Sequence, residues 1–222
     1  MGAALHIEDL GRVAYAEGLA LQERAVTARG AGERPDTLFL LEHPPVVTFG
    51  RGARAAHLLV SREALARQGI ELFEAKRGGD VTYHAPGQLV GYPILDLAAR
   101  GERDLHAYLR RLEAVLCDAL RALGVSPRVV AGRTGVFVDD PDPAAAPRKI
   151  ASIGVGARGW ITSHGFALNV DLDLAGFANI VACGLADVRM TSVAAELGRR
   201  APADVADRAR AAVRAAFGRH FG

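Results

Sequence analysis

The sequence predicts an α+β fold, a single domain of mixed, mostly antiparallel sheets flanked by helices. Two observations lead to this prediction: short strand patterns follow one another in hairpin-like pairs, and the helical patterns between them are well separated. A doubly wound sheet would alternate strands and helices more regularly than this chain does. The length of 222 residues suits one hydrophobic core, so we expect residues 1–222 to form one domain.

The first half of the chain begins with a helix pattern. Asp9 is expected to cap a helix over residues 11–29, and Ser61 to cap a short one that ends at Gln68. Because Pro93 has no backbone N–H, it is expected to place its strand at a sheet edge or near a bulge. Apolar runs between turn signals predict strands at residues 37–41, 46–49, 70–73, 80–83 and 89–95.

The second half contains the clearest helix, which follows Asp104 and ends at Gly124. Its apolar stripe recurs at spacings of four and three residues and consists of Leu105, Leu109, Leu112, Leu116, Leu120 and Leu123. A final helix opening at Pro202 is expected to bury Val205, Ala209, Ala212, Val213, Ala216 and Phe217. Strands are expected at residues 129–130, 135–138, 150–155 and 160–170, with a loop at 139–147.

Composition argues against several classes of protein. No apolar run approaches the ~20 residues of a membrane span, and the first ten residues lack the features of a secretion signal, so we expect a cytoplasmic protein. Two cysteines, Cys117 and Cys183, are too few for a disulfide framework, and Cys117 is expected to be core filler. A net charge of +2 with scattered arginines argues against nucleic acid, although a local basic surface can receive an acidic protein.

Three stretches have the composition of binding loops. Residues 76–97 are K-R-G-G-D-V-T-Y-H-A-P-G-Q-L-V-G-Y-P-I-L-D-L, residues 148–170 are R-K-I-A-S-I-G-V-G-A-R-G-W-I-T-S-H-G-F-A-L-N-V, and residues 180–185 are I-V-A-C-G-L. Glycines let a bound molecule approach the backbone closely, and the polar side chains between them can bind it. We expect the three stretches to form one site. A nucleotide site is a weaker interpretation, because neither G-x-G-x-x-G nor a Walker pattern is present.

Lysine is rare in this chain. Lys76 and Lys149 are the only lysines among 27 basic residues, and each stands at the start of a glycine-rich stretch. Arginine keeps its proton in proteins, whereas lysine can release one. The two retained lysines therefore hint at a site that needs proton transfer.

Cys183, followed by Gly184, is the candidate nucleophile, although a buried and inert cysteine is the more ordinary interpretation of this residue alone. An ammonium of Lys149 about 4 Å away would attract the thiolate by roughly 4 kcal/mol at an effective dielectric near 20. His84 and His164 are rival bases, and each can equally serve to order a loop. A zinc site of both histidines with Cys183 lacks the close ligand spacing of known zinc motifs.

The three stretches, in this order and at these separations, closely resemble the octanoyl-carrier-protein:protein octanoyltransferases of lipoate synthesis. The resemblance covers about residues 36–195 and implies the α+β fold of the biotin and lipoate ligase superfamily. It also implies that Cys183 accepts the acyl group and that Lys149 activates it. Two positions depart from the family pattern, since Ala85 replaces a glycine and Ala182 a proline.

The resemblance further implies a set of substrate-binding residues in the first two stretches. They are Arg77, Gly78, Gly79, Asp80, Val81, Thr82, Tyr83, His84, Ser152, Ile153, Gly154, Gly165, Phe166 and Ala167.

The reaction implied is the first step of protein lipoylation, without metal or other cofactor. An octanoyl group would pass from octanoyl-acyl carrier protein to Cys183, and then to a lysine of a lipoyl domain. The acceptors would be the lipoyl domains of 2-oxoacid dehydrogenase complexes and the glycine cleavage H protein. The alternatives are an ATP-dependent lipoate or biotin ligase, in which Cys183 would be idle, and a non-catalytic module that binds acyl carrier protein.

Overall fold

The structure is a computed structural model that describes residues 5–142, 144–185 and 187–222. Its strands are β1 (Leu5–Arg12), β2 (Asp36–Glu42), β3 (Val46–Phe49), β4 (Glu71–Glu74), β5 (Val81–His84), β6 (Gln88–Ile94), β7 (Val136–Val138), β8 (Arg148–Arg158) and β9 (Ile161–Asn169). Its α-helices are α1 (Tyr15–Gly30), α2 (Arg62–Arg67), α3 (Leu105–Ala122), α4 (Val193–Leu197) and α5 (Val205–Phe221).

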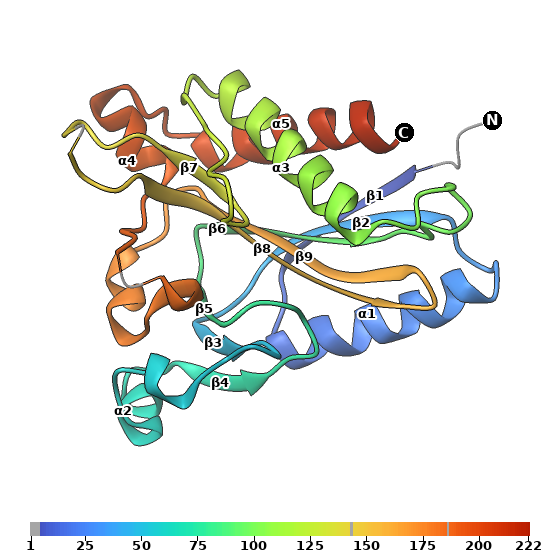
Figure 1. Ribbon diagram of the computed structural model, residues 1–222, viewed down its shortest axis with the longest axis horizontal. Coiled ribbons are helices and arrows are strands. Elements are labelled where there is room, and N and C mark those ends of the chain that lie inside the picture. The colour runs from blue at the N-terminus through green and yellow to red at the C-terminus, as the bar shows by residue number, and fades with distance from the viewer. Residues whose placement is uncertain (1–4, 143, 186) are drawn as a thin grey trace.

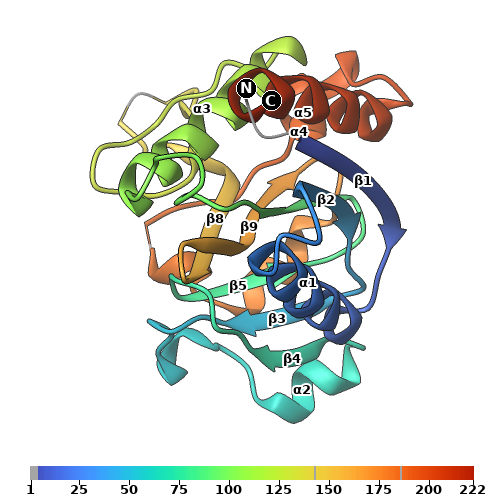
Figure 2. The ribbon, with the colours of Figure 1, turned by 90° about the vertical axis from the view of Figure 1, so that its right-hand side faces the viewer.

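The strands form two sheets, one in the order β1-β2-β6-β9-β8-β7 and a smaller one in the order β4-β3-β5. Among the described pairs, β1 with β2 and β3 with β4 run parallel, and the others are antiparallel. Helices α3 and α5 cover one face of the larger sheet, and α1 lies on the other side (Figures 1 and 2). The predicted α+β class is confirmed.

Strand β2 shows how the core is divided. Leu38 and Leu40 point into the cluster formed with α3 and α5, whereas Phe39 and Leu41 point into the cluster formed with α1. All four side chains are fully buried. Because successive side chains of a strand face opposite sides of the sheet, a continuous apolar run marks a strand that is covered on both faces.

The predicted helix over residues 11–29 is present as α1, but its predicted start and its cap at Asp9 were wrong. A strand, β1, occupies the segment around Asp9, and α1 begins at Tyr15 after Ala14, without a side-chain cap. Because β1 pairs with β2, Leu5 and Ile7 pack against the cluster formed with α3 and α5. This tertiary burial outweighs the local capping signal of Asp9.

Pro93 does not lie at an edge, because β6 runs between β2 and β9. The pairing of β6 with β9 is interrupted after Gly91 and Phe166 and resumes with the bridge between Asp96 and Ile161, so Pro93 lies in the gap. The Pro93 carbonyl accepts a hydrogen bond from the Thr162 hydroxyl of β9, at 2.7 Å. The backbone N and C=O of a strand residue face the same neighbour, so the missing N–H falls where that ladder is interrupted.

Most other predicted elements are confirmed. Ser61 caps α2 and Asp104 caps α3 through side-chain oxygens that accept backbone N–H groups. The hairpin of β8 and β9 closes through Gly159 and Trp160, both at positive φ, as a two-residue turn requires. Residues 129–130 form no strand, and Val129 is exposed. Helix α5 starts at Val205, slightly later than predicted.

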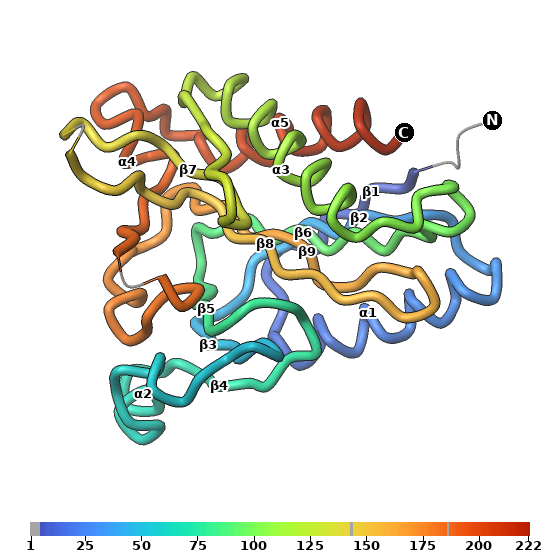
Figure 3. The backbone as a smooth tube through the Cα atoms, in the orientation of Figure 1, coloured from blue at the N-terminus to red at the C-terminus, as the bar shows by residue number. Residues whose placement is uncertain are grey.

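The segment that follows β9 connects the two sheets. It runs from the larger sheet down beside β5 and then returns toward α4 (Figure 3). Phe177, Ile180 and Ala182 from this segment pack with Val47 and Tyr83 of the smaller sheet. The segment is therefore held between the sheets by its own apolar side chains. No helix of the described residues is long and apolar enough to cross a membrane.

Candidate active site

Cys183 lies in a short, strained turn, the 3-10 segment Ala182–Gly184. Its backbone has φ 57° and ψ 19°, in the left-handed region that only a few non-glycine residues adopt. The N–H of Val181 donates to the carbonyl of His57 at 2.8 Å, which ties the turn to a neighbouring loop. Strain of this kind persists where surrounding contacts fix the backbone, and it concentrates at functional sites.

Lys149 extends from β8, where it pairs with Phe137 of β7. Its backbone N–H donates to the Arg189 carbonyl at 2.8 Å, and its carbonyl accepts from the Thr191 N–H at 2.9 Å. The chain that leaves the Cys183 turn therefore forms a short parallel bridge with β8 beside Lys149. This bridge explains how two distant parts of the sequence meet.

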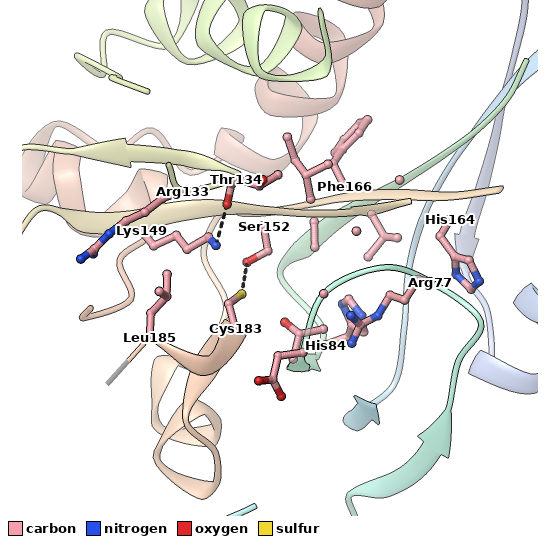
Figure 4. Close-up of a pocket in the computed structure, with 18 of the residues that line it drawn as sticks. Arg77, His84, Arg133, Thr134, Lys149, Ser152, His164, Phe166, Cys183 and Leu185 are labelled. Atoms are coloured by element: carbon pink, nitrogen blue, oxygen red, sulfur yellow. Dashed lines mark hydrogen bonds between the residues drawn. The ribbon is translucent and has the colours of Figure 1, made fainter. Parts of the chain in front are cut away.

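The Lys149 amine and the Cys183 sulfur point into the same space, on either side of the Ser152 hydroxyl (Figure 4). The Ser152 Oγ lies 3.7 Å from the Cys183 Sγ. The Lys149 Nζ donates to the Thr134 carbonyl at 2.9 Å. The lysine and cysteine singled out in the sequence are thus brought to one end of one cavity.

The side-chain amine of Lys149 is buried but has few polar partners among the described residues. The side chain is buried, with only 2% of its surface exposed. Within the described residues, it makes no ion pair with a carboxylate; its contacts are the Thr134 carbonyl and the ring of Phe137, whose centroid is 5.4 Å from Nζ. A carbonyl and an aromatic face both stabilise a cation, and they leave other N–H groups of the ammonium available.

The cavity has a volume of about 260 Å³. Strand alternation decides which residues of the first stretch line it: Thr82 and His84 do, whereas Val81 and Tyr83 point into the core of the smaller sheet. Gly78 lies outside the lining, and its N–H donates to the Val155 carbonyl. The remaining predicted residues all line the cavity: Arg77, Gly79, Asp80, Ser152, Ile153, Gly154, Gly165, Phe166 and Ala167.

The two rival bases, His84 and His164, lie farther from Cys183 along the cavity than Lys149 does (Figure 4). The Nδ1 of His84 is 2.7 Å from the Gln88 Oε1. Burial, together with the nearby His43, lowers the pKa of His84 to about 3, against the opposing effect of the Gln88 hydrogen bond. Burial and the charge of Arg77 lower the pKa of His164 to about 4. Both imidazoles are neutral at physiological pH, so neither supplies a cation for a thiolate.

These histidines predict an acid-sensitive fold. The unfolded chain binds protons at His84 and His164 below pH 6.5, whereas the folded chain binds them only near pH 3 and 4. Stability is therefore complete above pH 6.5 and falls with pH, at up to about 1.4 kcal/mol per pH unit for each histidine. Urea unfolding of His84→Asn is expected to show a shallower dependence on pH than wild type. His106→Gln, at an exposed position on α3, is expected to leave the dependence unchanged, and equal slopes in all three proteins would contradict the prediction.

The zinc alternative finds no support in the side-chain arrangement. In residues 5–142, 144–185 and 187–222, no three His, Cys, Asp or Glu side chains converge as metal ligands would. His84, His164 and Cys183 are therefore not gathered into a metal site.

Three polar residues at or near the site were not predicted from the sequence. Thr134 supplies the carbonyl that receives Lys149, and Glu113 of α3 accepts the N–H of the next residue, Gly135, at 2.9 Å. His57 lies 2.6 Å from Asp80, beside the Cys183 turn. Glu113 left a signal, because a carboxylate four residues after Leu109 falls within the apolar stripe of that helix. His57 and Thr134 left none.

Comparison with known proteins decides the family. A model of the lipoyl protein ligase A/B catalytic domain matches residues 14–217. The chain is 50% identical over 88% of its length to an octanoyltransferase of Geobacter metallireducens, 85% of which is covered. It is 47% identical over 100% of its length to an octanoyltransferase of Gloeobacter violaceus, 92% of which is covered. This chain belongs to the octanoyltransferase family. It is accordingly an acyltransferase, as the sequence predicted.

Solved structures support the fold of this octanoyltransferase family member. Lipoate-protein ligase A bound with ATP matches with a TM-score of 0.70 and 17% identity, over 99% of this chain and 85% of that one. A bipartite lipoate protein ligase from Thermoplasma acidophilum matches with a TM-score of 0.70 and 19% identity, over 99% and 84%. These likenesses confirm the predicted ligase-like fold.

The two departures from the family pattern fit this octanoyltransferase without strain. Ala85 is not among the residues with positive φ; the left-handed position of that loop is Gly87, at φ 85°. Ala85 and Ala182 both pack in the core of the smaller sheet. The two alanines therefore fill apolar space in that core and hold the loops that carry them in place.

Gly135 is expected to be sensitive to substitution in this octanoyltransferase. It has φ 120°, and an added Cβ would lie 2.7 Å from the Lys149 Cε and 2.6 Å from the Ala151 carbonyl. Gly135→Ala should therefore displace Lys149 and lower octanoyl transfer by about tenfold or more. Gly132→Ala, in the same loop at φ 76°, has open space at Cβ and should cause a smaller loss. Equal losses in steady-state assays of the two folded variants would contradict this account.

Proposed function

We propose that this chain transfers an octanoyl group from octanoyl-acyl carrier protein to a lysine of lipoyl domains, through a thioester on Cys183. The acceptors are the lipoyl domains of 2-oxoacid dehydrogenase complexes and the glycine cleavage H protein, and the enzyme acts in the cytoplasm as one catalytic domain without a cofactor. The observation that carries the proposal is the convergence of Lys149 and Cys183 beside Ser152, at one end of the cavity.

In the first step, the Cys183 thiolate attacks the thioester carbonyl of the donor. A bond forms between this carbonyl carbon and Sγ, and the bond to the pantetheine sulfur breaks. The departing sulfur takes a proton from the Lys149 ammonium, which leaves a neutral amine. One thioester replaces another, so the step is nearly balanced in free energy.

In the second step, the acceptor lysine arrives as an ammonium and gives one proton to the neutral Lys149. Its nitrogen then attacks the octanoyl carbonyl, and Cys183 leaves as a thiolate. The second proton of that nitrogen passes to water. Amide formation draws the reaction forward, and the Lys149 ammonium and Cys183 thiolate are restored without ATP.

The acyl chain would lie along the cavity beyond Ser152. Val90, Ile153 and Phe166 contribute apolar surface there. Six buried methylenes provide about 5 kcal/mol at roughly 0.8 kcal/mol each. For the oxyanion, the Gly79 N–H is the favoured donor, because those of Gly78 and Gly184 already donate to backbone carbonyls.

The test is octanoyl transfer from octanoyl-acyl carrier protein to a purified lipoyl domain, with and without ATP. The proposal predicts transfer that is independent of nucleotide and an octanoyl adduct on the enzyme by intact mass. A ligase would require ATP and would use free octanoate. A binding module would form a complex with acyl carrier protein and transfer nothing.

A further inference from the structure

We propose that Glu113 is a positioning residue for Lys149, and that its carboxylate acts through the Thr134–Gly135 peptide to keep the lysine charged and directed at Cys183. The inference rests on the proposed function, because it assigns to Glu113 a role in the chemistry of Lys149.

One peptide group connects the two charges. The Gly135 N–H donates to the Glu113 Oε1 at 2.9 Å, and the Thr134 carbonyl accepts from the Lys149 Nζ at 2.9 Å. This N–H and this carbonyl belong to the same peptide bond. The carboxylate therefore polarises the peptide so that its oxygen becomes a stronger acceptor for the ammonium.

Burial makes this connection energetically important. Glu113 is 1% exposed and Lys149 is 2% exposed. A buried charge is costly unless an opposite charge or hydrogen bonds compensate it. The second carboxylate oxygen of Glu113 lies 2.7 Å from an Arg110 guanidinium nitrogen, on a half-exposed side chain. A row of alternating charge thus runs from solvent at Arg110 through Glu113 and the peptide to Lys149.

Burial and the neighbouring groups act on the pKa of Glu113 in opposite directions. Burial raises its pKa, while the Gly135 N–H, Arg110 and Lys149 act to lower it. Cys117 lies on the same helix, and its pKa is raised by burial and, to a lesser extent, by Glu113. The ionised carboxylate opposes the loss of the proton from Lys149.

The intervening peptide has a chemical advantage over a direct ion pair. A carboxylate in contact with the ammonium would occupy its N–H groups and draw it away from sulfur. In the observed arrangement the ammonium uses one N–H for the Thr134 carbonyl. The others remain available for Cys183 and for the departing thiol.

The test is the pH profile of octanoyl transfer by Glu113→Gln, which keeps an acceptor for Gly135 but removes the charge. We expect kcat at neutral pH to fall about tenfold with KM little changed, and the alkaline limb to move down by about one pH unit. Asp118→Asn removes the same charge elsewhere on α3, where Asp118 pairs with Arg121 and His220. This control should retain the wild-type profile.

A second variant is expected to shift the alkaline limb of the pH profile in the opposite direction. This test holds even if Glu113→Gln does not fold. Arg110→Gln leaves Glu113 without its counter-charge, so the alkaline limb should move to higher pH. Glu113 acting only as a helix anchor predicts lower melting temperatures and unmoved limbs in both variants, and that result would overturn the inference.

The double variant Glu113→Gln/Lys149→Met separates this inference from the proposed function. We expect it to transfer no slower than Lys149→Met alone, and independent, multiplying losses would also overturn the inference. If Cys183→Ala still transfers the octanoyl group from octanoyl-acyl carrier protein, the proposed function fails. If Cys183→Ala is inactive while Glu113→Gln matches wild type, only the inference fails.

Discussion

Cys183→Ala is expected to abolish octanoyl transfer, with a loss on the order of a thousandfold or more. In the proposed mechanism, the substitution removes the atom that carries the acyl group between donor and acceptor. No octanoyl adduct should then be detectable by intact mass after incubation with octanoyl-acyl carrier protein. Binding of the carrier protein should persist, because the cavity that receives its acyl chain is otherwise unchanged.

The second thiol provides a matched control. Cys117 lies on α3 with 3% of its surface exposed, and burial raises its pKa above the ordinary value. Cys117→Ala should lower stability by about 1 kcal/mol through the lost packing, and leave transfer and adduct intact. An adduct that survives Cys183→Ala and disappears in Cys117→Ala would reverse the assignment of the nucleophile.

Lys149→Met is expected to lower kcat by about a hundredfold to ten-thousandfold, the usual range for a general acid and base. In the proposed mechanism, the variant removes both the charge beside Cys183 and the proton that the departing thiol takes up. Lys149→Arg restores the charge, but an arginine cannot release its proton. We therefore expect Lys149→Arg to remain at least tenfold below wild type.

Steady-state transfer assays at several pH values distinguish these two contributions of Lys149. Recovery of Lys149→Arg to wild-type kcat would show that charge alone suffices, and the proton-transfer role would then be wrong. A normal kcat in Lys149→Met would refute both roles. Intact melting temperatures in the variants exclude unfolding as the cause of any loss.

The parts of the fold that the sequence predicts well are those with locally complete signals. Helix α3 has a capping Asp104, an apolar stripe and Gly124 at its end, and all three work within the segment itself. Strand β2 is continuous in apolar residues because both of its faces are covered. Neither element needs distant partners to be recognised.

The parts that were predicted wrongly depend on partners elsewhere in the chain. The strand around Asp9 forms because β2 accepts it as a neighbour, which no local pattern indicates. Pro93 fits inside the larger sheet because the pairing with β9 is interrupted between Gly91 and Asp96. Neither the pairing of β1 with β2 nor the interrupted pairing of β6 with β9 can be recognised from the local sequence alone.

The candidate site divides in a similar way. The sequence motifs single out Cys183 and Lys149 as candidates, and the fold brings both to one cavity. The carbonyl of Thr134 could not be predicted from the sequence, because every residue carries a backbone carbonyl and nothing in the sequence shows which one lies beside Lys149. The family resemblance places Val81 and Tyr83 among the binding residues. Successive side chains of β5 face opposite sides, however, and these two point into the core of the smaller sheet.

The account depends on Lys149 keeping the Cys183 sulfur ionised, and alkylation kinetics test this most directly. The rate at which a small haloacetamide modifies Cys183 would be measured against pH in a Cys117→Ala background, with and without Lys149→Met. We predict that Lys149 sustains rapid thiolate alkylation at neutral pH and that its loss slows the reaction at least tenfold. Superimposable pH profiles for the two proteins would contradict the central claim.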